Sequence, residues 1–318
     1  MKKVFISRRI PEAGILLLKN HFDIDVWDEA LPPTYEQLVE RARNCDAVVS
    51  LLSDKIDRKF FDRCPKVKVI ANFAVGYNNI DIIEAKARGV LIGNTPDVLT
   101  EATADLAFSL TLACSRKLIS ASRNAADGQW KTWEPLGFLG QNLRKKTVGI
   151  MGIGRIGFEY AKLMKNAFQA NIIYTSRSKK EEAENVLGAV RVDINRLASE
   201  SDVLSIHCPL SDETANLIDI EFFNKMKSSS IIINTARGEI VDQDALYQSL
   251  FTGKIFAAGL DVTTPEPLSP ENELFNLENC IILPHIGSAT LEARTSMSLI
   301  CAKNIIAGLE GNPLPYEV

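Results

Sequence analysis

The sequence predicts an α/β protein made of two doubly wound domains, and three observations lead to this prediction. Short apolar runs alternate with amphipathic segments of helical spacing along almost the whole chain. Most of these runs are apolar at nearly every position, which suits parallel strands buried on both faces. The 318 residues are long for a single hydrophobic core and sufficient for two domains.

The first half of the chain predicts one parallel sheet with helices packed against it. Amphipathic segments at 34–43 and 80–88 carry apolar residues at helical spacing, and they separate apolar runs. Alternation of this kind is typical of doubly wound folds. The predicted strands are residues 3–7, 24–28, 47–52, 67–73 and 90–95.

The second half repeats this plan with stronger apolar runs. Each run is followed by a helix candidate or a loop, and the first is followed by an amphipathic helix at 158–167. A second parallel sheet is therefore expected. Its predicted strands lie in TVGIMG, NIIYTS, VLSIHCP, SIIINTA, AAGLDV and IILPH.

Two long segments without strand character, 101–124 and 290–310, are predicted helices that cross between the domains. The first domain would then be 1–98 plus 287–318, and the second domain would be 99–286. Ligands of such folds bind at the carboxyl ends of strands and between domains, so the cleft between the two domains is the expected site.

Composition and charge argue against several classes of function. A net charge of −4 argues against a nucleic-acid partner, which would usually require a basic protein. The six cysteines are scattered without a CxxC pair, so we expect reduced, buried thiols and no metal site. The N-terminal apolar run is too short for a signal peptide, and no stretch has membrane length, which predicts a cytoplasmic protein without membrane partners.

An irregular connection at 126–142 contains two tryptophans, Trp130 and Trp133. A loop with this many apolar side chains would expose them to water, so we expect a second subunit to bury them.

A glycine-rich turn follows the first strand of the second domain. Gly152, Gly154 and Gly157 match G-x-G-x-x-G between an apolar strand and an amphipathic helix. The first permits the turn, the second lets a pyrophosphate approach the backbone, and the third lets helix and strand pack closely. The alternative is a plain βα turn with helpful glycines. The other residues predicted to contact the dinucleotide at this turn are Ile153, Arg155 and Ile156.

The next strand ends in a basic loop where an acid would be expected. An acidic residue at this position would accept hydrogen bonds from the ribose hydroxyls of NAD. The chain has Thr175 there instead, followed by Ser176, Arg177 and Ser178 and then by two lysines. Hydroxyls and a guanidinium can bind a 2′-phosphate. We therefore predict preference for NADP(H), with NAD(H) as the alternative. A solvated loop with incidental charge is the competing interpretation.

Of the three histidines, His285 is the candidate acid/base. His21 is expected at the surface, and His207 would line the adenosine site or simply pack. His285 ends the last strand, and a reductase of carbonyls needs a proton donor near neutral pH. Glu266 would orient its ring, and Arg237 would hold a substrate carboxylate; both also follow strand ends.

In the first domain, Val75 and Gly76 follow an apolar strand in NFAVGYNNID. Their backbone N–H groups could face the substrate carboxylate. A simple βα turn is the alternative.

These motifs together resemble the D-isomer-specific 2-hydroxyacid dehydrogenase family over essentially the full length. The resemblance is carried by NFAVGYNNID, GNTPDVLTEATADLAFSL, GIMGIGRIG, HCPLSDET, INTARGEIVD, GLDVTTPEP and LPHIGSAT. It implies a flavodoxin-like substrate domain and a Rossmann domain, usually in a homodimer, with Arg237, Glu266 and His285 in the catalytic roles above. The further cofactor contacts predicted with this resemblance are Thr103, Pro209, Thr214, Thr235, Ala236, Asp261 and Gly287.

Within the family, the basic loop and GQWKTWEPLGFLG are most similar to glyoxylate/hydroxypyruvate reductases. The expected activity is therefore hydride transfer between NADP(H) and a small 2-oxo or 2-hydroxy acid. Three alternatives remain: a NAD-dependent D-3-phosphoglycerate dehydrogenase, a dinucleotide-sensing co-regulator and a structural dimer scaffold.

Overall fold

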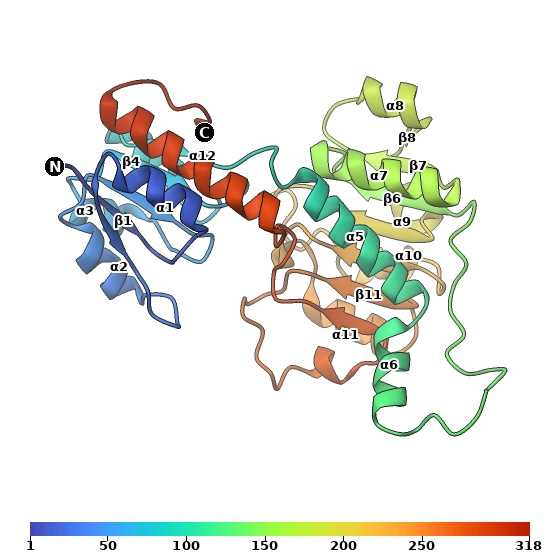
Figure 1. Ribbon diagram of the computed structural model, residues 1–318. Helices are drawn as coiled ribbons and strands as arrows, with labels where there is room; N and C mark the ends of the chain where they lie inside the picture. Colours follow the sequence, from blue (N-terminus) through green and yellow to red (C-terminus); the bar gives the residue numbers. More distant parts are fainter. The chain divides into compact units, whose positions relative to one another are not determined.

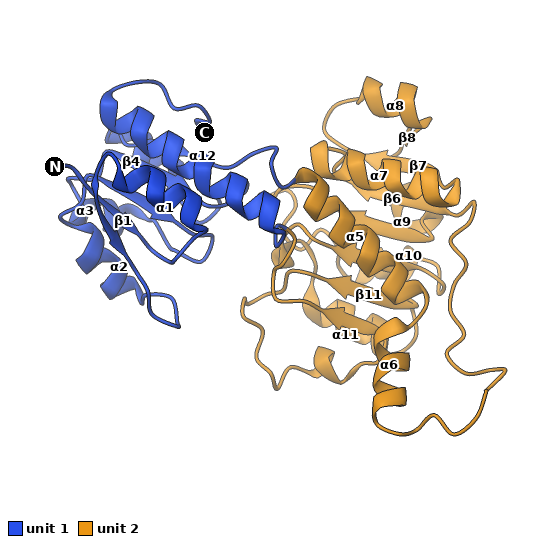
Figure 2. Cartoon of the chain, viewed as in Figure 1, with its two compact units in different colours: residues 1–99, 288–318 blue, residues 100–287 orange.

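The computed structural model describes all 318 residues and divides the chain into two compact units. Unit 1 comprises Met1–Leu99 and Ser288–Val318, and unit 2 comprises Thr100–Gly287 (Figure 2). Each unit is an α/β structure built on one parallel sheet, which confirms the predicted fold class. None of the helices combines the length and the apolar composition that a membrane span requires.

Unit 1 is a five-stranded sheet in the order β2-β1-β3-β4-β5, with helices on both faces. Side chains alternate along β1: Val4 and Ile6 enter the core under α1 and α12, and Phe5 enters the core under α2 and α3. In Figure 1, α12 lies along α1. The strands are β1 (Lys3–Ile6), β2 (Asp23–Val26), β3 (Ala47–Ser50), β4 (Val69–Asn72) and β5 (Leu91–Gly93), and the helices are α1 (Glu12–Lys19), α2 (Tyr35–Ala42), α3 (Arg58–Arg63), α4 (Ile82–Ala87) and α12 (Leu291–Glu310).

Unit 2 is a seven-stranded sheet in the order β12-β11-β10-β9-β6-β7-β8. In β10, Ile231 and Ile233 face the core under α5 and α7, and Ile232 faces the core under α9, α10 and α11. The strands are β6 (Thr147–Met151), β7 (Asn171–Thr175), β8 (Val190–Arg191), β9 (Val203–Ile206), β10 (Ile231–Asn234), β11 (Ala257–Leu260) and β12 (Cys280–Ile282). The helices are α5 (Thr100–Ser115), α6 (Leu118–Ala126), α7 (Arg155–Phe168), α8 (Glu181–Leu187), α9 (Ile194–Glu200), α10 (Ile220–Lys225) and α11 (Gln243–Phe251), with 3-10 turns at Gly238–Ile240 and Glu273–Asn276.

The strand order of unit 2 reverses at β6. The chain leaves β6 for β7 and β8 on one side, then returns to β9 on the other side. Ligands of doubly wound sheets bind at the carboxyl ends of the strands beside such a reversal. The loop after β6 is the glycine-rich turn, so the topology places that turn at the expected ligand position.

Two elements differ from the sequence prediction. The helix expected over 101–124 is interrupted, because Lys117 adopts a left-handed backbone (φ 50°) between α5 and α6. The short strand β8 was not predicted, because its two residues are both exposed and give no apolar run. The helix expected over 290–310 is α12, and the connection expected at 126–142 is irregular after Ala126, which is the last residue of α6.

Candidate active site

Two glycines of the turn after β6 are required by the packing of the chain. Gly152 has φ +89°, and a Cβ there would lie 2.6 Å from the backbone N of Cys208. A Cβ on Gly157 would lie 2.5 Å from the carbonyl oxygen of Gly152. Any side chain at either position would push apart β6, α7 and the segment after β9.

Gly154 is different, because nothing in the chain requires a glycine there. Its backbone (φ −79°, ψ −163°) is open to any residue, and a Cβ would have no atom within 4 Å. This open space lies at the N-terminus of α7, a helix of 14 residues whose first N–H groups and dipole favour an anion. The site therefore fits the pyrophosphate of a dinucleotide.

The basic loop after β7 is ordered by its own contacts. Ser176 Oγ donates to the carbonyl oxygen of Ser178 at 2.6 Å. The Arg177 side chain is exposed, and no hydrogen bond or ion pair holds it. Lys179, one of the two lysines that follow Ser178, is paired with Glu184 at 3.0 Å, which reduces the positive charge that it contributes to the loop.

His285 and Glu266 form a pair beyond the ends of β12 and β11. His285 Nδ1 lies 2.8 Å from Glu266 Oε2, and Glu266 Oε1 accepts from the backbone N–H of Thr263 at 3.1 Å. An ionised carboxylate holds the proton on Nδ1, which leaves Nε2 to exchange a proton with a ligand. The His285 side chain is 25% exposed, and its backbone is left-handed (φ 53°), a conformation rare for residues with a side chain.

Asp261 anchors the loop that carries this histidine. Its two carboxylate oxygens accept from the backbone N–H groups of Ile286 (2.7 Å) and Gly287 (2.8 Å), and its carbonyl accepts from His285 N–H. Burial raises the pKa of Asp261, and these N–H groups and His285 oppose that rise. Asp261 was predicted from the resemblance as a cofactor contact; sequence reasoning did not reveal its role in holding the His285 loop.

Arg237 follows β10 in a turn held by Asn234. The Asn234 side chain donates to the carbonyl of Arg237 (2.8 Å) and accepts from Ala236 N–H (3.0 Å). Burial lowers the pKa of Arg237, and Glu266 and Glu239 oppose that shift. An arginine guanidinium is charged at neutral pH because its ordinary pKa lies far above 7.

Gly238 brings the Arg237 turn against the segment that leads to Glu266. A Cβ at this glycine would lie 2.1 Å from the carbonyl oxygen of Thr263, so only glycine permits this backbone approach. A glycine directly after a candidate arginine is the one sign of this approach in the sequence, and it does not identify Thr263 as the partner.

The remaining predicted cofactor residues of unit 2 lie on the same side of the sheet, at or beyond its carboxyl end. Thr103 Oγ1 donates to the carbonyl of Gly287 at 3.3 Å, and Thr214 Oγ1 donates to that of Pro209 at 2.8 Å. The Thr235 hydroxyl is enclosed and has no hydrogen-bond partner within the chain.

In unit 1, two asparagines hold the Val75–Gly76 turn. Asn94 donates to the carbonyl of Val75 and Asn72 to that of Gly76, both at 2.8 Å. The backbone N–H groups of Val75 and Gly76 donate to no atom of the chain. Two free adjacent N–H groups suit an anion.

His207 is a packing residue. Its Nε2 lies 2.8 Å from Ser205 Oγ, and its ring centroid lies 5.3 Å from that of Tyr160. Enclosure by these neighbours lowers the pKa of His207 to about 3, so the ring is neutral near pH 7. All six cysteines are free thiols, and burial raises the pKa of Cys208 to about 11.

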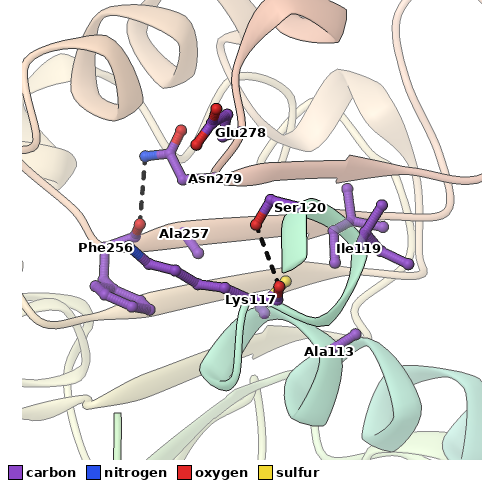
Figure 3. Close-up of a pocket in the computed structure, with 10 residues that line it drawn as sticks. Ala113, Lys117, Ile119, Ser120, Phe256, Ala257, Glu278 and Asn279 are labelled. Carbon is purple, nitrogen blue, oxygen red and sulfur yellow. Dashed lines mark hydrogen bonds between the residues drawn. The ribbon is translucent and has the colours of Figure 1, made fainter. Parts of the chain in front are cut away.

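A pocket lies at the opposite edge of the unit 2 sheet. Residues of α5 and α6 and the amino ends of β11 and β12 line it (Figure 3). Lys117 Nζ lies 5.4 Å from the Phe256 ring centroid, and Asn279 donates to the Phe256 carbonyl at 3.3 Å. None of the predicted site residues lines this pocket.

Comparisons with known proteins show what this chain is similar to. The sequence profile described as "D-isomer specific 2-hydroxyacid dehydrogenase, NAD binding domain" matches residues 108–287. A glyoxylate reductase of Thermococcus litoralis is 48% identical over 99% of this chain and 96% of that protein.

Two solved structures are also similar. The structure of a Thermus thermophilus protein has a TM-score of 0.93 and 38% identity, and covers 99% of both chains. That of an NADPH-dependent glyoxylate/hydroxypyruvate reductase from Sinorhizobium meliloti, in complex with NADP and malonate, has a TM-score of 0.88 and 30% identity over 100% of this chain and 96% of that chain.

Proposed function

The chain belongs to the D-isomer specific 2-hydroxyacid dehydrogenase family, an NAD(P)-dependent family of oxidoreductases, and from this premise we propose that it reduces small 2-oxo acids with NADPH. Glyoxylate and hydroxypyruvate are the first substrates proposed. The observation that carries the proposal is the pair formed by His285 and Glu266, whose side chains lie 2.8 Å apart. Asp261 anchors the residues that directly follow His285. A relative is named glyoxylate reductase, which supports the substrate class.

His285 is the proton donor in this proposal. With Nδ1 held by Glu266, Nε2 gives its proton to the substrate oxygen as the carbonyl is reduced. The charged guanidinium of Arg237 binds the substrate carboxylate and stabilises negative charge on the oxygen. When bound, the nicotinamide dinucleotide supplies the hydride for the keto carbon.

Val75 and Gly76 are proposed to bind the substrate carboxylate through their free backbone N–H groups. Asn94 and Asn72 donate hydrogen bonds to the carbonyls of Val75 and Gly76, and so hold the turn that carries these N–H groups. Changing Asn94 to Ala should raise KM for the 2-oxo acid and leave KM for the cofactor unchanged. An unchanged KM for the acid would contradict this assignment.

Replacement of His285 by Ala tests the mechanism. The variant should lose roughly 10²–10⁴-fold in kcat, the usual range for a positioned general acid. Its affinity for the dinucleotide, measured by fluorescence titration, should stay near the wild-type value. Turnover at the wild-type rate would remove His285 from the mechanism.

A substrate panel tests the activity itself. Glyoxylate, hydroxypyruvate, pyruvate and 3-phosphohydroxypyruvate should be assayed with NADPH and with NADH. We expect the highest kcat/KM with glyoxylate or hydroxypyruvate and NADPH. A preference for the phosphorylated acid would indicate a phosphoglycerate dehydrogenase, and tight cofactor binding without turnover would indicate a dinucleotide sensor.

The preference for NADP(H) rests on the loop after β7. Thr175 occupies the position where an acid would repel a 2′-phosphate, and the Arg177 guanidinium is exposed and unpaired. The similar structure from Sinorhizobium meliloti is that of an NADPH-dependent reductase in complex with NADP. Changing Thr175 to Asp should lower kcat/KM for NADPH and leave that for NADH equal or higher. Equal kcat/KM values for both cofactors in the wild type would refute the preference.

A homodimer is proposed because α6 and the following connection present apolar side chains without cover. None of the α6 side chains is buried, and Trp130, Trp133 and Leu136 are 74%, 80% and 80% exposed. Such a surface is typical of a subunit interface. Light scattering should give twice the chain mass, and a Trp130→Ser/Trp133→Ser variant should give the monomer mass. A monomeric wild type would refute this proposal.

A further inference from the structure

We propose that Arg191, on the edge strand β8, is a positioning residue that shapes the basic loop after β7 for the 2′-phosphate of NADP(H); this inference rests on the proposed cofactor preference. β8 is parallel to β7, with Tyr174 opposite Arg191 in the register. The carboxyl end of β8 therefore meets the loop that follows β7.

The Arg191 guanidinium holds two consecutive carbonyl groups of this loop. Its Nη2 donates to the carbonyl oxygens of Ser176 (2.8 Å) and Arg177 (3.0 Å). These bonds are charge-assisted, which makes them stronger than neutral hydrogen bonds. They fix the orientation of the peptide groups 176–177 and 177–178.

This orientation leaves two N–H groups available on the other side. Both peptide bonds are trans, so the N–H groups of Arg177 and Ser178 point opposite to the carbonyls that Arg191 holds. Neither N–H donates to an atom of the chain. Successive free N–H groups form a concavity that binds anions.

Charge in this region favours the same assignment. Lys179 is paired with Glu184, and the first turn of α8 adds Glu181 and Glu182. Without Arg191, the positive charge left to the loop would come from Arg177 and Lys180. Arg191 is exposed, and only its Nη2 is used within the chain, so its charge also acts toward a phosphate at the loop.

The test compares Arg191→Gln with two matched variants. Arg191→Lys keeps the charge and a donor. Arg196→Gln removes the same charge from α9, where Arg196 pairs with Glu200 at 2.8 Å away from the loop contacts. Calorimetric titration would measure binding of adenosine 2′,5′-bisphosphate and of adenosine 5′-monophosphate, without turnover. KM for NADPH and for NADH would be measured in parallel.

Arg191→Gln should weaken binding of the bisphosphate and raise KM for NADPH by about tenfold, as expected for the loss of charged hydrogen bonds. Binding of the monophosphate and KM for NADH should change by less than about twofold, because these two ligands lack the 2′-phosphate. The kcat should also change by less than about twofold, because Arg191 is proposed to act on cofactor binding alone. Arg191→Lys should restore most of the bisphosphate affinity, and Arg196→Gln should match the wild type.

Equal weakening toward both nucleotides would show a merely structural role and overturn the inference. So would a bisphosphate affinity unchanged by Arg191→Gln in a wild type that prefers NADPH, and the cofactor proposal would then stand. A wild type that binds the two nucleotides equally would refute the cofactor proposal itself, and Arg191 would then have no phosphate to serve.

Discussion

Replacing Gly154 by Ala should separate ligand binding from folding at the turn after β6. A Cβ at this position meets no atom of the chain within 4 Å, and the backbone conformation is open to alanine. Loss of glycine at an N-cap costs a few tenths of a kcal/mol to about 1 kcal/mol, and the reduced freedom of the unfolded chain offsets about 0.4–1 kcal/mol. The thermal midpoint should therefore stay near that of the wild type.

The cofactor should respond strongly to the same change. The added methyl group occupies the space at the N-terminus of α7 where the pyrophosphate would lie, and forced contacts of this kind cost about 1–3 kcal/mol. This predicts a loss of roughly 5- to 150-fold in dinucleotide affinity, measured by fluorescence titration.

Gly157→Ala is the matched control. Its Cβ would lie 2.5 Å from the Gly152 carbonyl oxygen, so the variant should lose about 1–3 kcal/mol of stability by overpacking. Calorimetry of both variants gives the comparison. Wild-type cofactor affinity in Gly154→Ala, or a large drop in its thermal midpoint, would refute the placement of the pyrophosphate.

Three further predictions concern other contacts. In the wild type, the folded pKa of His207, about 3, lies below the unfolded value of about 6.5, so between these values the unfolded state binds one proton more. The wild type therefore loses stability as pH falls below about 6.5, by roughly 2–3 kcal/mol at pH 4.5. His207→Asn should remove this loss. Thermal unfolding of both proteins from pH 7 to 4.5 checks this, and an equal loss of stability in the wild type and the variant would contradict it. Asp261→Asn leaves one of the two backbone N–H groups of Ile286 and Gly287 without an acceptor. This change should lower kcat at least about tenfold and the free energy of unfolding by about 1–3 kcal/mol. Steady-state kinetics checks the first effect, and calorimetry checks the second. Gly238→Ala would place a Cβ 2.1 Å from the Thr263 carbonyl oxygen and displace the Arg237 turn, so KM for the 2-oxo acid should rise; an unchanged KM would show that this approach is not needed.

Sequence patterns were sufficient for much of the candidate site, for a physical reason. Parallel strands bring their carboxyl ends to one edge of the sheet, so residues that follow strand ends meet there. Arg237, Glu266 and His285 could be selected by this rule together with the chemistry of their side chains, and the structure places Glu266 and His285 in contact. The glycine-rich turn was recognisable because its spacing reflects local geometry.

What the amino-acid sequence by itself determined was therefore the alternation of strands and helices, the fold class, the glycine turn and the residues at strand ends, because each depends on periodicity or on neighbours in the chain. Only the tertiary structure showed that Asp261 anchors the His285 loop, that Gly238 packs against Thr263, and that Arg191 holds the loop at 176–177. It also showed that Gly154, alone among the three turn glycines, is not needed for packing. Each of these facts concerns a contact, or open space, between residues distant in the chain, and no local pattern records which distant residue folding brings near.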